Sequence, residues 1–135
     1  MANALYPLWK QAIMENSSNS ALTGTVKAAL VDTDVYTYSA SDQFYTAISS
    51  AVVGTPQTLT NKVYTNGIFS ADDTAFTSLS GAEVEAVVLY IDTGSAATSR
   101  LVAYLDTGVT GLPFTPNGGN VTLIWDTGVN KIFKL

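Results

Sequence analysis

The segment Glu83-Val84-Glu85-Ala86-Val87-Val88-Leu89-Tyr90-Ile91-Asp92 decides the fold, because it is the most apolar strand-like part of the chain. Alternate positions from Val84 to Tyr90 are apolar, and so are the intervening positions from Val87 to Ile91. Successive side chains of a strand point to opposite faces, so both faces of this strand are apolar. The pattern predicts a central strand that is covered on both sides.

This strand ends in Asp92-Thr93-Gly94, and the same tripeptide recurs at Asp106-Thr107-Gly108 and Asp126-Thr127-Gly128, each time after an apolar run. Asp bonds its own backbone in turns, and Gly tolerates positive φ. Three copies after strand-like segments predict a sheet protein that uses one kind of turn repeatedly. Residues 100–106 are expected to pair with the apolar strand across the first of these turns.

Elsewhere the chain alternates between short strand patterns and two helical patterns. Leu5, Leu8, Trp9 and Ile13 form an amphipathic stripe that predicts a helix over residues 3–15. Phe44, Ile48 and Val52 recur at helical spacing and predict a second short helix within residues 41–53. Further strands are expected at 25–32, 35–38, 57–65, 68–70, 74–79, 121–126 and 131–135.

Many short strands with few helices predict a mostly β fold, specifically a jelly-roll-like antiparallel β-sandwich with a short N-terminal helix and one further short helix. At 135 residues the chain is expected to form a single domain over 1–135. Within it, residues 1–20 would be an N-terminal helix or arm and residues 21–135 the β-sandwich.

The composition restricts the chemistry that this chain can perform. It contains no Cys and no His, which removes disulfides, thiolate and imidazole ligands, and Ser-His-Asp or Cys-His sites. Its six Lys and Arg are scattered and the net charge is −5, so nucleic-acid binding is not expected. No stretch approaches the roughly 18 apolar residues of a membrane span, and residues 1–16 do not resemble a secretion signal. We expect a soluble chain with no cofactor, no metal and no membrane partner.

One enzymatic interpretation is an aspartic protease. The segment 89–96 is similar to the apolar-Asp-Thr-Gly-Ser segment of that family, in which Asp92 would be the catalytic residue of a homodimer. The later apolar-apolar-Gly segment of the family has only poor matches, at 109–111 and 123–125. Because Asp106 and Asp126 have nearly the same context as Asp92, plain turns are the preferred interpretation.

Two interpretations as binding sites also compete with purely structural explanations of the same residues. Asp32-Thr33-Asp34 and Asp72-Asp73 offer carboxylates for Ca²⁺, but solvated turns explain them better because neither has the EF-hand pattern. Tyr36, Tyr38 and Tyr45 could line a carbohydrate-binding surface, although core and cross-strand packing is the more common use of strand tyrosines.

Several segments together resemble small virion proteins of tailed bacteriophages, in particular the capsid cement (decoration) proteins of Bordetella-type short-tailed phages. The similarity spans nearly the whole chain. Its segments are MANALY at 1–6, VDT at 31–33, QFY at 43–45, EAVVLYIDTG at 85–94, SRLVAY at 99–104, GLPFTPNGG at 111–119 and IFKL at 132–135.

The resemblance implies a non-enzymatic jelly-roll subunit that dimerises and sits on the outside of the capsid. It would be made in the host bacterial cytoplasm, bind the major capsid protein and cement neighbouring subunits of the expanded shell. A phage tail or fibre module that binds a host glycan is the main alternative.

Amphipathicity and turn exposure suggest which residues of this chain would contact the partner. A helix that packs on its own domain is the preferred interpretation of residues 3–15. If this segment is instead an arm that docks on a partner, we expect Leu5, Tyr6 and Trp9 to make the contact, since aromatic anchors dominate interface energy. From the proline-containing loop we expect Leu112, Pro113 and Phe114, because two prolines in residues 112–116 exclude a central strand.

Overall fold

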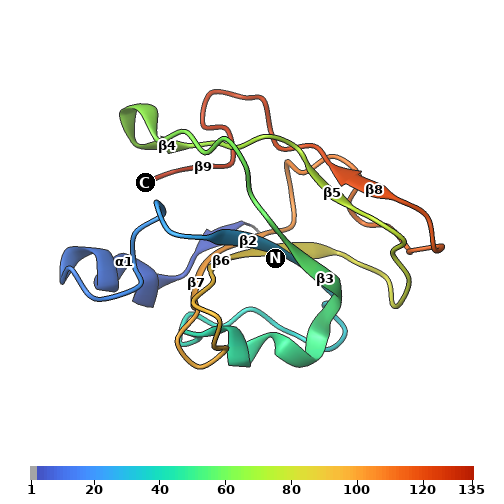
Figure 1. Ribbon diagram of the computed structural model, residues 1–135, viewed down its shortest axis with the longest axis horizontal. Coiled ribbons are helices and arrows are strands. Elements are labelled where there is room, and N and C mark those ends of the chain that lie inside the picture. The colour runs from blue at the N-terminus through green and yellow to red at the C-terminus, as the bar shows by residue number, and fades with distance from the viewer. Residues whose placement is uncertain (1–2) are drawn as a thin grey trace.

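The computed structural model describes residues 3–135 and is built around a five-stranded antiparallel sheet (Figure 1). Its strands lie in the order β1-β7-β6-β2-β3. Their bounds are Ala4–Leu5 for β1, Arg100–Leu105 for β7, Ala86–Ile91 for β6, Val26–Val31 for β2 and Val52–Thr58 for β3. All six residues of β6 are buried, which confirms the expected central strand.

Strand β6 pairs with β2 along its whole length, from Val26 opposite Ile91 to Val31 opposite Ala86. It pairs with β7 on its other side, with a bulge after Leu89. β3 forms one edge of the sheet and contains Pro56, which is compatible with an edge because proline cannot donate to a ladder. The strand expected at 57–65 therefore begins and ends earlier than the sequence pattern suggested.

A second layer covers one face of this sheet and consists of two short antiparallel ladders (Figure 1). One ladder joins β4 (Ile68–Phe69) to β9 (Phe133–Lys134), and the other joins β5 (Thr74–Phe76) to β8 (Val121–Leu123). We call residues 60–76 and 121–135 the outer layer. The mostly β class with a layered sheet arrangement is confirmed; the jelly-roll connectivity stays a prediction, because the two ladders remain separate.

The opposite face of the sheet is covered by residues 32–51, which we call the covering segment. It contains two 3₁₀ helices, η1 (Tyr45–Ala47) and η2 (Ser49–Ala51), so the second helix exists as two tight turns and not as one α-helix. The strand expected at 35–38 does not form. A third 3₁₀ turn, η3 (Thr65–Gly67), occupies the Asn-Gly turn before β4, where Asn66 has a φ of 57°.

The single α-helix among the described residues, α1 (Pro7–Met14), packs on its own domain. Pro7 occupies the first turn, where its missing N–H costs nothing. Trp9 is 1% exposed, lies edge-on against Phe133 at 5.7 Å, and donates from Nε1 to the Ser20 carbonyl at 2.9 Å. Within residues 3–135, no helix combines the length and the hydropathy that crossing a membrane requires.

Aromatic side chains are segregated between the two faces of the sheet. Phe69 of β4 and Phe133 of β9 stack at 5.2 Å within the outer layer, and Trp9 packs edge-on against Phe133. Tyr104 and Tyr90 point to the other face, because they follow the same alternation across the β6–β7 pairing. The face under the covering segment is therefore the polar aromatic side of the molecule.

Candidate functional site

Tyrosines gather on the face under the covering segment. Tyr38 lies between Tyr6 and Tyr104, with ring centroids at 5.1 and 5.6 Å. Tyr45 packs on Tyr90 at 4.7 Å. Six of the seven tyrosines share this face, namely Tyr6, Tyr36, Tyr38, Tyr45, Tyr90 and Tyr104.

A chain of hydroxyl hydrogen bonds runs through this cluster. Tyr36 donates to Asp42 Oδ2 at 2.7 Å, so the 2.8 Å contact between the Tyr6 and Tyr36 hydroxyls must have Tyr6 as its donor. Burial raises the pKa of both phenols far above the ordinary value, and the Tyr36 hydrogen bond raises that of Tyr6 further. Both hydroxyls therefore stay neutral and hold the covering segment against the start of the chain.

Beside this chain lies an open pocket of about 390 Å³, which we call the tyrosine pocket. It is lined by Thr33, Tyr36, Thr37, Tyr38, Glu85, Tyr104, Asp106 and Pro113. These residues come from the covering segment, the start of β6, the end of β7 and the proline-containing loop. Tertiary structure brings these distant segments together at one end of the sheet.

The charged residues that line the pocket are all acidic, since the lining includes two carboxylates and no Lys or Arg. Burial raises the pKa of the Tyr104 phenol, and the charges of Asp106 and Glu85 raise it further. Glu85 Oε2 also accepts a hydrogen bond from the Thr33 N–H at 2.9 Å. A negative, aromatic cavity of this kind suits binding of a ligand more than proton transfer, because its phenols do not titrate near neutral pH.

Glu85 also belongs to an acidic group with Asp32 and Asp34, in which one carboxylate oxygen from each residue lies within 4.8 Å of the others. Asp32 Oδ1 accepts the Asp34 N–H at 2.9 Å, so the two aspartates shape the turn that follows β2. This matches the expectation of turn carboxylates at Asp32-Thr33-Asp34.

The expected contact residues of the N-terminal arm are largely inside the protein. Tyr6 is 0% and Trp9 1% exposed, so neither side chain is available as a surface anchor, and that expectation is corrected. The reason is that β1 joins the sheet and α1 packs against β9, which turns both rings inward. Leu5 is half-buried on β1.

The expected contacts of the proline-containing loop remain at the surface. Pro113 is exposed and lines the tyrosine pocket, while Leu112 and Phe114 are half-buried. The loop is held by two backbone hydrogen bonds between Phe114 and Val84, at 2.8 and 3.0 Å. It therefore presents a fixed surface beside the pocket.

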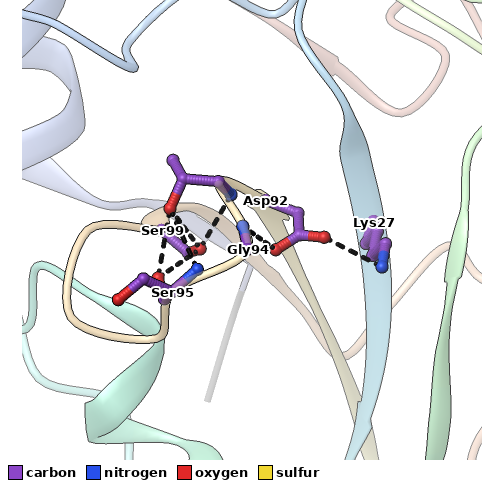
Figure 2. A network of polar contacts seen from close by, with 6 residues as sticks. Lys27, Asp92, Gly94, Ser95 and Ser99 are labelled. Carbon is purple, nitrogen blue, oxygen red and sulfur yellow. Dashed lines mark hydrogen bonds and ion pairs between the residues drawn. The ribbon is translucent and has the colours of Figure 1, made fainter.

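The first Asp-Thr-Gly copy forms a polar turn tied to β2 (Figure 2). Asp92 Oδ1 accepts the Gly94 N–H at 3.0 Å, and Oδ2 pairs with the Lys27 ammonium at 2.9 Å. The buried Ser99 hydroxyl accepts the Thr93 N–H at 3.0 Å and donates to the Ser95 carbonyl at 2.8 Å. The Lys27 hydrogen bond and then the Gly94 N–H hold the pKa of the Asp92 carboxyl below its ordinary 3.8.

The other two copies form turns as well. Asp126 Oδ1 accepts the Gly128 N–H at 2.8 Å, which repeats the bond of the first copy. In the second copy the Asn3 side chain is the acceptor, for the Asp106 and Thr107 N–H groups at 2.7 and 2.9 Å. The interpretation of the tripeptide as a turn is therefore confirmed at all three positions.

The outer layer carries a group of exposed apolar side chains that the sequence interpretation did not single out. Val129 is 87% exposed and Leu135 is 58% exposed. The exposed large apolar residues of this layer are Val63, Tyr64, Ile124, Val129 and Leu135. Period-two alternation around the buried Leu123 and Trp125 was a signal for Ile124, whereas Val129 lies in a turn that carries no such pattern.

Comparison with known proteins adds no family assignment. No protein-family model matches the chain, and no curated protein matches it.

Proposed function

We propose that this protein is a virion structural protein that binds the outside of a phage capsid and cements neighbouring major capsid protein subunits, stabilising the expanded shell. The resemblance of its segments to capsid cement proteins motivates the proposal. The observation that carries it is the apolar outer layer, in which five exposed large apolar side chains lie in the segments that flank two short ladders.

These side chains favour a protein partner for a physical reason. Removal of exposed apolar groups from water at a partner surface lowers the free energy of the complex. In addition, only 13% of the residues of the chain are charged. Covering such a surface removes little charge from water, so the unfavourable desolvation of ions stays small. The apolar outer layer is therefore proposed as the main contact with the capsid.

Cementing would arise from many contacts of modest strength. A subunit or homodimer that touches several capsid proteins gains from the raised effective concentration of each further contact. If it binds the expanded shell and not its precursor, it stabilises the expanded state by mass action. Unpaired edges of β4–β9 and β5–β8 offer main-chain groups that an extended capsid segment can pair with.

The proline-containing loop is proposed as a second contact, through Pro113 and the exposed parts of Leu112 and Phe114. It belongs to the tyrosine-pocket side of the molecule, whereas the outer layer covers the other face of the sheet. Two contact surfaces on different sides allow one copy to bridge two partners. Tyr6 and Trp9 have no part in this contact, because they are buried.

The first test is the copy number of this chain in purified virions relative to the major capsid protein, measured by quantitative mass spectrometry. A ratio near that of the capsid protein is expected. Detection of only a few copies per particle, or of none, would overturn the cement proposal.

The second test is co-sedimentation of the purified protein with expanded shells. Val129→Gln should weaken binding, since it makes an exposed outer-layer position polar. Met14→Gln is the matched control, because Met14 is 81% exposed on α1, outside the outer layer. Equal binding by both variants would show that the outer layer is not the contact surface.

A second candidate function is a tail or fibre module that binds a host glycan. The tyrosine pocket favours it, because aromatic faces and carboxylate acceptors are typical of carbohydrate sites. A low copy number together with binding to host surface glycans would support this alternative.

A further inference from the structure

The exposed apolar side chains of the outer layer share their surface with lysines, whereas the acidic residues of the chain lie outside it or at its border. We define the lysine face as residues 62–71 and 127–135, two neighbouring segments of the outer layer. We propose that the lysine face binds a protein surface that has an apolar centre and carboxylate side chains around it. This inference rests on the proposed function, since it names the chemistry of the capsid surface that the outer layer would contact.

Strand pairing holds the two segments of the lysine face side by side. Val63 pairs with Ser70, and Lys134 of β9 lies opposite Ile68 of β4. Figure 1 shows β4 and β9 next to each other at the surface of the outer layer. Lysines and apolar groups therefore belong to one part of the surface. Its exposed large apolar side chains are Val63, Tyr64, Val129 and Leu135.

The charge of the lysine face is opposite to that of the remaining chain. The face contains three of the six basic residues and none of the 11 acidic residues, although the net charge of the chain is −5. An α-carboxylate after Leu135 would offset one of these three positive charges and leave the face positive. Because potentials of opposite sign meet across specific interfaces, a partner surface that carries carboxylates is favoured.

Two of the three lysines are free to reach a partner. Lys131 and Lys134 are exposed and have no ion-pair partner among residues 3–135. The Lys62 ammonium instead donates to the main-chain carbonyls of Leu22 and Gly24. It holds the loop before β2 against the outer layer, so Lys131 and Lys134 are the residues that we assign to the contact.

Three aspartates border the lysine face, and their carboxylates are held by this chain. Asp72 accepts a hydrogen bond from the Asn61 side chain, and Asp73 accepts one from a main-chain N–H at 3.3 Å. Asp126 accepts the N–H two residues further on at 2.8 Å, and it lines the same small cavity as Lys131. The charge of Lys131 is therefore offset more than that of Lys134, and Lys134 is expected to contribute more to binding.

Other occupants of the lysine face are less favourable. A two-fold contact between copies of this chain uses the same patch on both, so it would bring lysines of the two copies together. A nucleic acid or an anionic bilayer would meet the negative net charge of the whole chain at close range. A protein surface can instead place a few carboxylates beside the lysines and apolar groups between them.

The test is co-sedimentation of the purified full chain with expanded shells at about 50 mM and about 300 mM sodium chloride. Lys134→Gln should raise the dissociation constant about threefold at the lower salt concentration, and the double variant Lys131→Gln/Lys134→Gln about fivefold, because exposed charge pairs are modest in strength. The difference between the parent chain and the double variant should shrink at the higher concentration, since salt screens exposed charges. A double variant that binds as tightly as the parent chain at low salt would overturn the proposal.

Two controls separate a local charge effect from other causes. Lys131→Arg/Lys134→Arg keeps both charges at the same positions and should bind within about twofold of the parent chain. Lys10→Gln makes the same change of net charge on α1, where Lys10 is exposed outside the lysine face. Equal weakening by Lys10→Gln and Lys134→Gln would reduce the effect to general charge and refute the assignment. Thermal unfolding of each variant checks that it folds like the parent chain.

Two further measurements decide between occupants. Flotation of the parent chain with phosphatidylglycerol vesicles, lost in the double glutamine variant, would assign the lysine face to an anionic lipid surface and overturn the choice of a protein. Self-association in analytical ultracentrifugation that the double glutamine variant loses would assign the face to a second copy and overturn it as well. We expect neither result.

Failure of this inference differs from failure of the proposed function. A parent chain that binds shells at neither salt concentration refutes the capsid as the partner. A parent chain that binds shells, together with glutamine variants that bind equally well, retains the proposed function and refutes the acidic partner surface.

Discussion

The hydroxyl groups of Tyr6 and Tyr36 lie 2.8 Å apart in the protein interior, and this contact joins the N-terminal strand to the covering segment. Tyr6 is fully buried, and the Tyr36 hydroxyl donates a second hydrogen bond to Asp42. The pair explains why residues 35–38 do not form a strand. The side chains of Tyr36 and Tyr38 are held in the tyrosine cluster, and the backbone of residues 35–38 has no neighbouring strand to pair with.

Tyr6→Phe removes one hydroxyl from this pair and leaves the ring packing unchanged. We expect the free energy of unfolding to fall by about 1 kcal/mol, because a buried hydrogen bond is lost while Tyr36 can still donate to Asp42. Urea unfolding measures the change. Tyr64→Phe is the control and should alter stability by less than about 0.5 kcal/mol, since Tyr64 is 42% exposed. Equal losses in both variants would contradict the role assigned to the pair.

Trp9→Ala should destabilise the fold by about 3 kcal/mol or more, because it leaves a cavity beside Phe133 and breaks the bond to the Ser20 carbonyl. Met14→Ala, at an exposed position of the same helix, should have almost no effect. Thermal unfolding of the two variants measures how much stability each one loses. A Trp9→Ala protein of unchanged stability that fails to bind shells would restore Trp9 as a surface anchor.

Gly54→Ala should cost about 3 kcal/mol of unfolding free energy, because φ is 73° and the new methyl group would overlap the buried Leu79 side chain. Gly94→Ala has a similar φ of 87° but open space around the methyl position, so only about 1 kcal/mol of backbone strain is expected. Chemical denaturation of both proteins compares the two costs. The reverse order of stability would show that close packing at Gly54 is not what requires glycine.

The ion pair of Asp92 with Lys27 should make stability depend on pH. Because the folded-state pKa of Asp92 lies below the ordinary 3.8, its contribution is present above that value and is lost as the pH falls through the folded-state pKa. Asp92→Asn should therefore lower stability by about 0.5 kcal/mol at about pH 6 and by almost nothing at about pH 2. Unfolding curves at both pH values test this, in the parent chain and in a Lys27→Met background. A loss that is the same at both pH values would contradict the electrostatic origin.

Much of the central sheet could be predicted from sequence, because its signals are local. The doubly apolar segment 83–92 became the buried middle strand, and its Asp-Thr-Gly end became a turn closed by the Asp92 side chain. A helix was also expected near the start of the chain, but it forms over Pro7–Met14 and not over residues 3–15, because Ala4 and Leu5 pair with β7 as strand β1. The central strand and the turn depend on residues that are neighbours along the chain.

The candidate site was less predictable. Pro113 and Tyr36 were singled out separately, but nothing in their spacing indicated that they would line one pocket with Glu85 and Tyr104. The amphipathic stripe of Trp9 indicated an apolar face without indicating what covers it. In this fold β9 covers it, from the other end of the chain.

The sequence by itself determined the central strand, the repeated turn and the limits on chemistry, since periodicity, turn residues and the lack of Cys and His are properties of the chain alone. Only the tertiary structure decided that Tyr6 and Trp9 are buried, that Val129 is exposed and that the acidic and aromatic groups converge. The physical reason is that burial and electrostatic environment depend on contacts between residues far apart in sequence, and local patterns carry no record of those contacts.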